Sequence, residues 1–260
     1  MPDSDTQYID VGSGADRRRI AVLRDGGRTP GLIWLPGFKS DMVSTKATVL
    51  SDWARQKGLA CTRFDYSGHG HSEGRFEDGT VSRWLEETRA VFSHMTEGPV
   101  VVVGSSMGGY IAMLLLRQLM AEDAPEAARI KALVLIAPAW DMTEDLMWKQ
   151  FPEDVKRKIA EDGVWLRPSA YGDPYPITRG LIEDGRNHLF ERKPWNPGRP
   201  VHILQGQQDP DVPWEHTRVL ESFLTGGWAR VTAVPDGDHR LSRPEDLELM
   251  CQVVGELTSA

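Results

Sequence analysis

Short, unbroken apolar runs alternate with segments of helical periodicity from residue 31 to the end of the chain. Continuous β-branched runs of this kind suit parallel strands that are buried on both faces, whereas half-exposed strands alternate apolar and polar residues. The runs span residues 31–36, 59–64, 100–103, 132–137, 201–204 and 230–234. Before them, residues 7–11 and 18–23 flank a Gly-Ser-Gly turn signal and predict an opening hairpin. We therefore expect a doubly wound α/β fold around a mostly parallel sheet of eight strands.

Amphipathic helices fill the intervals between the predicted strands. Residues 44–57 join the first two core runs, and residues 81–95 carry apolar side chains at spacings of three and four. A third helix is expected to begin at Ser106. Ser242 and Glu245 match a capping box, which predicts the start of the last helix.

One long segment, roughly residues 139–197, interrupts this alternation. A structureless loop of that length is implausible in a compact domain, so we expect the segment to be structured. It contains a predicted helix from Pro152 to Gly163, with a proline start and a glycine stop, and a second one over 176–189. We expect one domain over residues 1–260, in which this helical insertion caps the carboxyl edge of the sheet.

Composition excludes several classes of function. The formal net charge of −8 argues against a nucleic-acid partner or an anionic membrane surface, both of which need a basic face. No apolar stretch reaches the length of a membrane span, and residues 1–5 are polar and acidic, unlike a secretory or mitochondrial presequence. The cytoplasm is therefore the expected compartment. Cys61 and Cys251 stand alone, without a zinc-like Cys/His spacing, so we expect neither a metal nor a cofactor.

The strongest motif is Gly104-Ser105-Ser106-Met107-Gly108, which lies between a predicted strand and a predicted helix. This strand–turn–helix context is the one in which a G-x-S-x-G sequence presents a serine nucleophile. Ser105 is the alternative, but the two glycines flank Ser106 symmetrically, and small neighbours are what a sharp turn requires. The start of the helix also adds a partial positive charge where an oxyanion would form. We predict Ser106 as the nucleophile.

A serine hydroxyl is a weak nucleophile and needs a histidine base, which a carboxylate orients. In folds with this motif, the chain order is serine, acid, histidine. The histidines after the motif are His188, His202, His216 and His239. His239 directly follows the last predicted strand, where a loop can return over the sheet edge, so it is the predicted base.

Three aspartates are candidates for the acid. Asp209 lies just after the predicted strand at 201–204, Asp211 is two residues further on, and Asp141 follows the preceding strand. Loop aspartates most often cap turns or helices, which is the alternative for each of them. We rank Asp209 ahead of Asp211, and Asp211 ahead of Asp141.

An oxyanion hole needs two backbone donors. One is the N–H of the residue after the nucleophile, here Met107. The other is expected at Phe38, which follows the end of the first core strand.

The predicted cap is rich in aromatic and flexible apolar residues. They are Trp140, Met142, Leu146, Met147, Trp148, Phe151, Trp165, Tyr171 and Tyr175. Most are expected to form the cap's own core, while some face Ser106, because a cap at this sheet edge roofs the cleft. Trp140 and Trp148 are the predicted substrate-binding residues. The expected partner is a small-molecule or acylated substrate with an apolar acyl or aromatic group.

Several motifs together resemble a known superfamily. They are Gly104-x-Ser106-x-Gly108, Gly206-x-x-Asp209-x-x-Val212-Pro213 and Asp65-Tyr66-Ser67-Gly68-His69-Gly70-His71-Ser72. The chain resembles the α/β-hydrolase superfamily, and its first half is similar to the abhydrolase-domain-containing protein ten group. The narrower similarity lies in Leu35-Pro36-Gly37-Phe38, the stretch from Arg63 to Gly70, Arg83-Trp84-Leu85-Glu86 and the stretch from Val103 to Gly109.

The resemblance implies the α/β-hydrolase fold and a serine esterase or thioesterase, since members of the group are described as palmitoyl-protein thioesterases and acyl-glucuronide esterases. It maps the nucleophile, acid and base onto Ser106, Asp209 and His239. A cofactor-free haloperoxidase or C–C bond hydrolase with the same triad is one alternative, and a non-catalytic ligand-binding descendant is another. His69 and His71 belong to a glycine-rich turn and are expected to be structural, because no further ligand completes a metal site.

Overall fold

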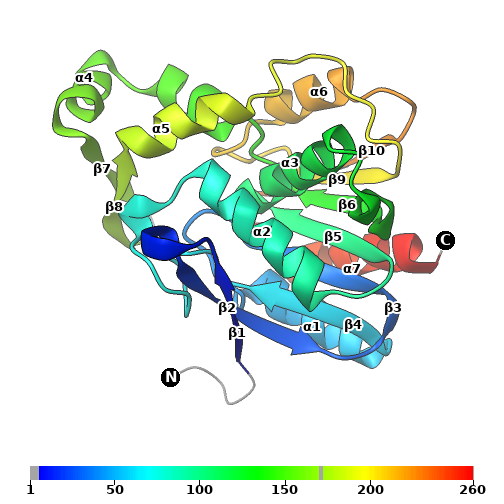
Figure 1. Ribbon diagram of the computed structural model, residues 1–260. Helices are drawn as coiled ribbons and strands as arrows, with labels where there is room; N and C mark the ends of the chain where they lie inside the picture. Colours follow the sequence, from blue (N-terminus) through cyan, green and yellow to red (C-terminus); the bar gives the residue numbers. More distant parts are fainter. Residues whose placement is uncertain (1–5, 170–171, 260) are drawn as a thin grey trace.

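Eight strands form one sheet at the centre of the computed structural model, which describes residues 6–169 and 172–259 (Figure 1). The strand order is β1-β2-β4-β3-β5-β6-β9-β10. The strands are β1 (Gln7–Val11), β2 (Arg18–Asp25), β3 (Arg28–Leu35), β4 (Leu59–Phe64), β5 (Val100–Ser105), β6 (Ile130–Ile136), β9 (Val201–Gly206) and β10 (Ala229–Val234). Strand β2 pairs antiparallel with β1 and β4, and all the other neighbours are parallel. The predicted mostly parallel sheet of eight strands is confirmed.

The unbroken apolar runs are explained by burial of the central strands on both faces. In β5, Val100 and Val102 pack into one hydrophobic cluster, while Val101 and Val103 pack into another on the opposite face of the sheet. Side chains alternate between the two faces of a strand, so a strand covered on both sides needs apolar residues at every position.

Helices cover both faces of the sheet (Figure 1). They are α1 (Thr45–Gln56) and α7 (Pro244–Ser259) on one face, and α2 (Val81–Met95), α3 (Met107–Ala121) and α6 (Trp214–Phe223) on the other. This two-sided cover is the doubly wound arrangement expected from the alternation of strands and helices.

The last helix begins differently from the prediction. Helix α7 starts at Pro244, and the N–H of Arg243 donates to Asp246 Oδ2 at 3.1 Å. The Ser242 hydroxyl donates instead to the carbonyl oxygen of Arg240, two residues earlier, at 2.9 Å. The predicted Ser242 capping box is therefore wrong by one residue. The physical reason is Pro244, whose fixed φ and missing N–H suit the first helical position.

The chain between β6 and β9 forms the cap. Its elements are η4 (Met142–Met147), η5 (Trp148–Gln150), α4 (Glu153–Asp162), β7 (Val164–Ser169), β8 (Gly172–Thr178), α5 (Arg179–Gly185) and η6 (Arg186–His188). Helix α4 confirms the first predicted cap helix. The second predicted helix, 176–189, begins only at Arg179. Residues 1–5 and Tyr171, both used in the sequence predictions, lie outside the described residues.

The cap is not purely helical, because β7 and β8 pair as an antiparallel hairpin. Pro168, Pro174 and Pro176 lie in these strands and removed the usual strand signal from the sequence. Both strands of a two-stranded sheet have a free edge, where proline is tolerated because no ladder hydrogen bond is needed there. The prediction of a helical cap is corrected to a mixed one.

Polar contacts fasten the cap to the sheet domain. Asp184 of α5 accepts hydrogen bonds from the N–H and hydroxyl of Ser82, at the start of α2, at 2.8 and 2.6 Å. Arg117 of α3 donates to the carbonyl oxygens of His188 and Leu189 in the cap, at 2.6 and 3.1 Å. Figure 1 shows α5 beside the end of α2. The cap is therefore tied to α2 and α3 of the sheet domain.

Candidate active site

Ser106 occupies a sharp turn between β5 and α3. Its φ is +54° and its ψ is −118°, a combination that non-glycine residues rarely adopt. The turn is held from both sides. The Ser106 N–H donates to Ile136 O at 2.8 Å, and Ser106 O accepts from the N–H groups of Gly109 and Ala139 at 3.0 and 3.1 Å. The surrounding strands therefore maintain a strained backbone that presents the serine at the end of the sheet.

The two glycines of the motif are required by close backbone contacts. A Cβ atom added to Gly104 would lie 2.3 Å from Gly108 O, and one added to Gly108 would lie 2.0 Å from Leu35 O. Both distances are far below van der Waals contact, and both neighbours are backbone atoms that have no room to move. The spacing of the motif thus follows from the packing of α3 against the ends of β3 and β5.

Ser106, His239 and Asp209 form one chain of hydrogen bonds. His239, on the loop after β10, places Nε2 3.1 Å from Ser106 Oγ and Nδ1 2.8 Å from Asp209 Oδ2. The carboxylate can only accept, so Nδ1 carries the proton and Nε2 is free to accept from the serine hydroxyl. The structure thus brings together three residues that are far apart in the sequence, in the order a serine nucleophile requires.

Asp209 is firmly oriented. It is 6% exposed, in the turn after β9. Oδ1 accepts from the N–H groups of Asp211 and Val212, both at 2.8 Å, while Oδ2 accepts from Gln205 Nε2 at 3.1 Å in addition to His239. Hydrogen bonds to an ionised carboxylate are stronger than neutral ones, so this set holds the carboxylate in place.

The two other candidate acids occupy different positions. Asp211 is exposed, and a carboxylate oxygen lies within 4.8 Å of the ligand atoms of Asp209 and His239. Asp141 is buried and holds the cap through Phe190, and burial raises its pKa above the usual value. Of the three, only Asp209 makes a hydrogen bond to His239 among the described residues.

The remaining histidines make local contacts away from Ser106. His188 contacts the Ser82 hydroxyl, His202 contacts Thr232, and the His216 ring nitrogen contacts a backbone carbonyl. Burial lowers the pKa of all three rings. Of the four histidines after the motif, His239 is the one that contacts Ser106 among the described residues.

The two predicted oxyanion donors belong to segments that lie against Ser106. Met107 is the first residue of α3, where helix geometry provides no acceptor for the N–H. Phe38 follows Gly37, and a Cβ atom added to Gly37 would lie 3.3 Å from Ser106 Cβ, so this loop passes directly beside the serine. Within residues 6–169 and 172–259, neither N–H has an acceptor. Both are available to a bound oxygen.

A cavity of about 300 Å³ lies next to Phe38. It opens between the loop after β3, the glycine-rich turn that includes His69, and β8 of the cap, and Lys39 and Tyr175 are among its lining residues. The rings of Phe38 and Tyr175 meet edge to face with centroids 5.8 Å apart. The cap thus contributes an aromatic residue to this cavity, whose lining among the described residues includes neither Ser106 nor His239.

Neither tryptophan predicted to bind substrate lines this cavity. Trp140 is fully buried, and its ring stacks on that of His216 with the centroids 4.4 Å apart. Its Nε1–H donates to the backbone carbonyl oxygen of His216. Trp148 lies against the guanidinium of Arg186, 5.3 Å from its ring centroid. Both therefore pack within the cap and its junction with α6, as expected for most of the aromatic residues of the cap.

Gln205 was not predicted from the sequence. It is fully buried at the end of β9, and its Nε2 donates to Asp209 Oδ2 at 3.1 Å and to Val212 O at 3.0 Å. Its Oε1 accepts from the Thr217 hydroxyl at 2.7 Å. A glutamine at the carboxyl end of a mostly apolar strand was the available signal, because a buried amide there needs partners at the sheet edge.

Replacing Gln205 with leucine is expected to lower kcat for an ester substrate by about tenfold, because a hydrogen bond to a charged group contributes about 1.5–3 kcal/mol. The same loss should lower the free energy of unfolding by about 1–3 kcal/mol, since Thr217 and Val212 lose their buried partner. Steady-state kinetics and urea unfolding measure the two effects. Gln208→Leu, an exposed glutamine in the same turn, is the matched control and should change neither. An unchanged kcat in Gln205→Leu would contradict the orienting role.

Comparisons with known proteins identify the family of the chain. The sequence model of the alpha/beta hydrolase family matches residues 26–248. Palmitoyl-protein thioesterase ABHD10, mitochondrial, from Bos taurus is 32% identical over 94% of this chain and 78% of that protein. The protein of the same name from Homo sapiens is 30% identical over 93% of this chain and 77% of that protein.

Solved structures show the same relationship. A proposed hydrolase from Agrobacterium vitis S4 superimposes with a TM-score of 0.93 at 43% identity, over 97% of this chain and 98% of that one. Mouse alpha/beta hydrolase domain-containing protein 10 has a TM-score of 0.84 at 27% identity, over 98% of both chains.

The names of the ABHD10 relatives place those proteins in mitochondria, so the cytoplasmic location expected for this chain stays a prediction. Among the described residues, every helix is too short or too polar to cross a membrane. The family match over most of the chain and the ABHD10 similarity over more than nine-tenths of it lead to one conclusion. The chain is a hydrolase-fold protein that belongs to the alpha/beta hydrolase family.

Proposed function

We propose that this protein is a serine hydrolase that cleaves carboxylic esters or thioesters through an acyl-enzyme on Ser106. The observation that carries the proposal is the hydrogen-bonded series from Ser106 Oγ through His239 to the buried Asp209. A strained serine, a neutral histidine acceptor and an oriented carboxylate are the parts that acyl transfer requires.

In the first half-reaction, Ser106 Oγ attacks the carbonyl carbon and His239 Nε2 takes the hydroxyl proton. The carbonyl oxygen becomes an oxyanion that accepts hydrogen bonds from the N–H groups of Phe38 and Met107. When the tetrahedral intermediate collapses, the bond to the leaving oxygen or sulfur breaks. His239 gives its proton to that group, and the acyl chain stays on Ser106. Asp209 stabilises the imidazolium that exists between these two proton transfers.

In the second half-reaction, water takes the place of the leaving group. His239 Nε2 removes a proton from the water, whose oxygen attacks the acyl carbon. The same two backbone donors bind the second oxyanion. Collapse releases the carboxylic acid and returns the proton to Ser106 Oγ, which restores the starting state.

The substrate class we propose is an acyl ester or thioester with an apolar acyl group. Relatives named palmitoyl-protein thioesterases support the thioester, and the esterase and thioesterase reactions share one tetrahedral intermediate. The edge-to-face contact of Phe38 with Tyr175, a residue that lines the neighbouring cavity, supports an apolar group.

A fluorophosphonate probe tests the proposal directly, because it phosphonylates only an activated serine. We expect covalent labelling of the folded wild-type protein at Ser106, located by mass spectrometry of the digested protein. Labelling should disappear in Ser106→Ala and after denaturation. A folded wild-type protein that is not labelled would overturn the proposal.

The substrate class needs a second measurement. A series of p-nitrophenyl esters and matched acyl thioesters of increasing chain length gives kcat/KM as a function of the acyl group. A rise with chain length supports an apolar acyl site, because each buried methylene contributes about 0.8 kcal/mol, or about fourfold in kcat/KM. A flat series would remove the acyl preference while leaving the serine chemistry intact.

A further inference from the structure

The glycine-rich motif at residues 65–72 lies against the loop that carries Phe38. We call residues 36–42, which leave the carboxyl end of β3, the oxyanion loop, and residues 65–72 the support motif. At the far end of the loop, the Met42 N–H donates to Asp65 Oδ1 at 2.7 Å. Asp65 is fully buried, so this contact anchors one end of the loop on the support motif.

A second contact reaches the middle of the loop. The Lys39 N–H donates to His69 Nε2 at 3.1 Å. The other ring nitrogen, Nδ1, faces Ser67 O at 3.1 Å, where only a donor can bind. Nδ1 therefore carries the proton and Nε2 is the acceptor. Burial lowers the pKa of His69, which is 5% exposed, so the neutral ring that this arrangement requires is the stable form at pH 7.

The contact from His69 acts on a turn that needs support. The Ser40 N–H donates to Gly37 O at 3.0 Å, which makes Phe38 and Lys39 the two central residues of a tight turn. Lys39 has a φ of +60°, a left-handed conformation that is unfavourable for a residue with a side chain. By holding the Lys39 N–H, His69 fixes the peptide plane next to the one that carries the Phe38 N–H.

The His69 ring is itself immobilised by aromatic packing. It meets Phe38, Phe76 and Trp84 edge to face, with centroids 6.5, 5.1 and 5.6 Å away. Phe76 lies in η2 (Phe76–Asp78), and Trp84 lies in α2. His69 therefore contacts both the backbone of Lys39 and the ring of Phe38 in the oxyanion loop.

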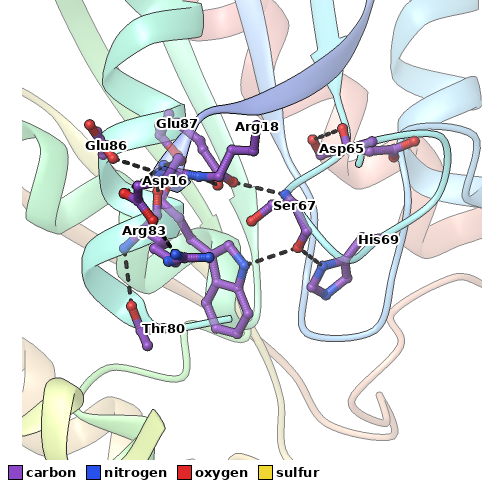
Figure 2. Close-up of polar contacts among 12 residues, drawn as sticks. Asp16, Arg18, Asp65, Ser67, His69, Thr80, Arg83, Glu86 and Glu87 are labelled. Atoms are coloured by element: carbon purple, nitrogen blue, oxygen red, sulfur yellow. Dashed lines mark hydrogen bonds and ion pairs between the residues drawn. The ribbon is translucent and has the colours of Figure 1, made fainter. Parts of the chain in front are cut away.

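Figure 2 shows how the support motif is anchored behind His69. The Ser67 N–H donates to Glu87 Oε2 at 2.9 Å, and Glu87 is fully buried and paired with the buried guanidinium of Arg18. Separating a buried ion pair leaves an uncompensated buried charge, which is strongly destabilising, so Arg18 and Glu87 stay in place. His69 thus hydrogen-bonds to a segment that the interior of the protein holds rigidly.

We propose that His69 is a positioning residue, which orients the Phe38 N–H toward the oxyanion by accepting the Lys39 N–H. The inference rests on the proposed function, since it assigns a role in forming the predicted oxyanion hole. It gives the support motif a purpose beyond that of a structural turn, the role expected for His69 from the sequence.

Two substitutions at His69 test the acceptor role in the full-length protein with a p-nitrophenyl ester. His69→Leu removes the acceptor, and we expect kcat to fall by about 10- to 100-fold, approaching the loss of one oxyanion donor. KM should stay close to the wild-type value, because the donor acts on the transition state and not on the bound ester. His69→Gln retains an acceptor oxygen at similar reach and should restore most of kcat.

His202→Leu is the matched control. His202 is also 5% exposed, and its Nε2 contacts the Thr232 hydroxyl at 2.8 Å, away from the oxyanion loop. Its replacement should lower Tm without lowering kcat. The inference is overturned by a His69→Leu protein with wild-type kcat, or by a His69→Gln protein that is folded and as slow as His69→Leu.

Two further readouts separate the possible failures. Fluorophosphonate labelling of the wild-type protein reports on the proposed function alone. If the wild-type protein is labelled and His69→Leu has wild-type kcat, the inference is overturned and the proposed function stands. If His69→Leu does not fold, 15N NMR of the wild-type histidines decides. A neutral His69 protonated at Nδ1 supports the inference, and one protonated at Nε2 overturns it, because that nitrogen could not accept from Lys39.

Discussion

Replacing Ser106 with alanine is expected to lower kcat for an activated acyl ester by about 10⁵- to 10⁶-fold, the loss seen when a triad nucleophile is removed. Ser106 Oγ is the atom that forms the acyl bond in the proposed reaction, and no neighbouring group can take its position. The oxyanion donors and the bound substrate remain, so a small rate above that of water should persist. The measurement is steady-state hydrolysis at high enzyme concentration, with the spontaneous rate subtracted.

Ser105→Ala is the control within the same motif. Ser105 ends β5 and is 7% exposed, and its side chain makes no hydrogen bond within the described residues. We expect its kcat to remain near that of the wild-type protein. A large loss in Ser105→Ala together with retained activity in Ser106→Ala would transfer the nucleophile to Ser105 and contradict the proposed mechanism.

Most of the fold could be predicted because its strands are buried on both faces. Such strands leave uninterrupted apolar runs in the sequence, and the helices between them leave periodic stripes. The cap hairpin of β7 and β8 leaves neither signal. Its strands pair only with each other, so Pro174 and Pro176 can occupy free edges, and Leu166 is 59% exposed. A pattern based on burial has little to detect in such a ribbon.

The site could be predicted where chain order determines it. Asp209 and His239 follow the last two strands of the sheet, and parallel strands bring those ends to one edge. The roles of Gln205 and His69 depend on which groups they contact in the fold, and the sequence pattern does not give those contacts. Trp140 shows the opposite error. Its aromatic character predicts an apolar surface, but composition does not tell which side of the cap a ring faces.

Replacing Asp209 with asparagine is expected to lower kcat by about 10³- to 10⁴-fold while leaving the fold intact. The wild-type carboxylate accepts from His239 Nδ1–H and so keeps Nε2 unprotonated for Ser106. An amide at the same place donates through its NH₂ group, which favours the tautomer with the proton on Nε2. That tautomer cannot accept the Ser106 proton. Kinetics at saturating ester measure the loss, and circular dichroism checks the fold.

Asp211→Asn separates this effect from a simple loss of charge. Asp211 is exposed, two residues from Asp209, and its carboxylate lies within 4.8 Å of the same cluster of ligand atoms. The substitution removes the same charge from the same turn but does not touch the hydrogen bond to Nδ1. Exposed charges interact weakly through water, so kcat should change by less than about threefold. If Asp211→Asn loses as much activity as Asp209→Asn, the field of the two carboxylates matters more than the tautomer, and the role assigned to Asp209 is wrong.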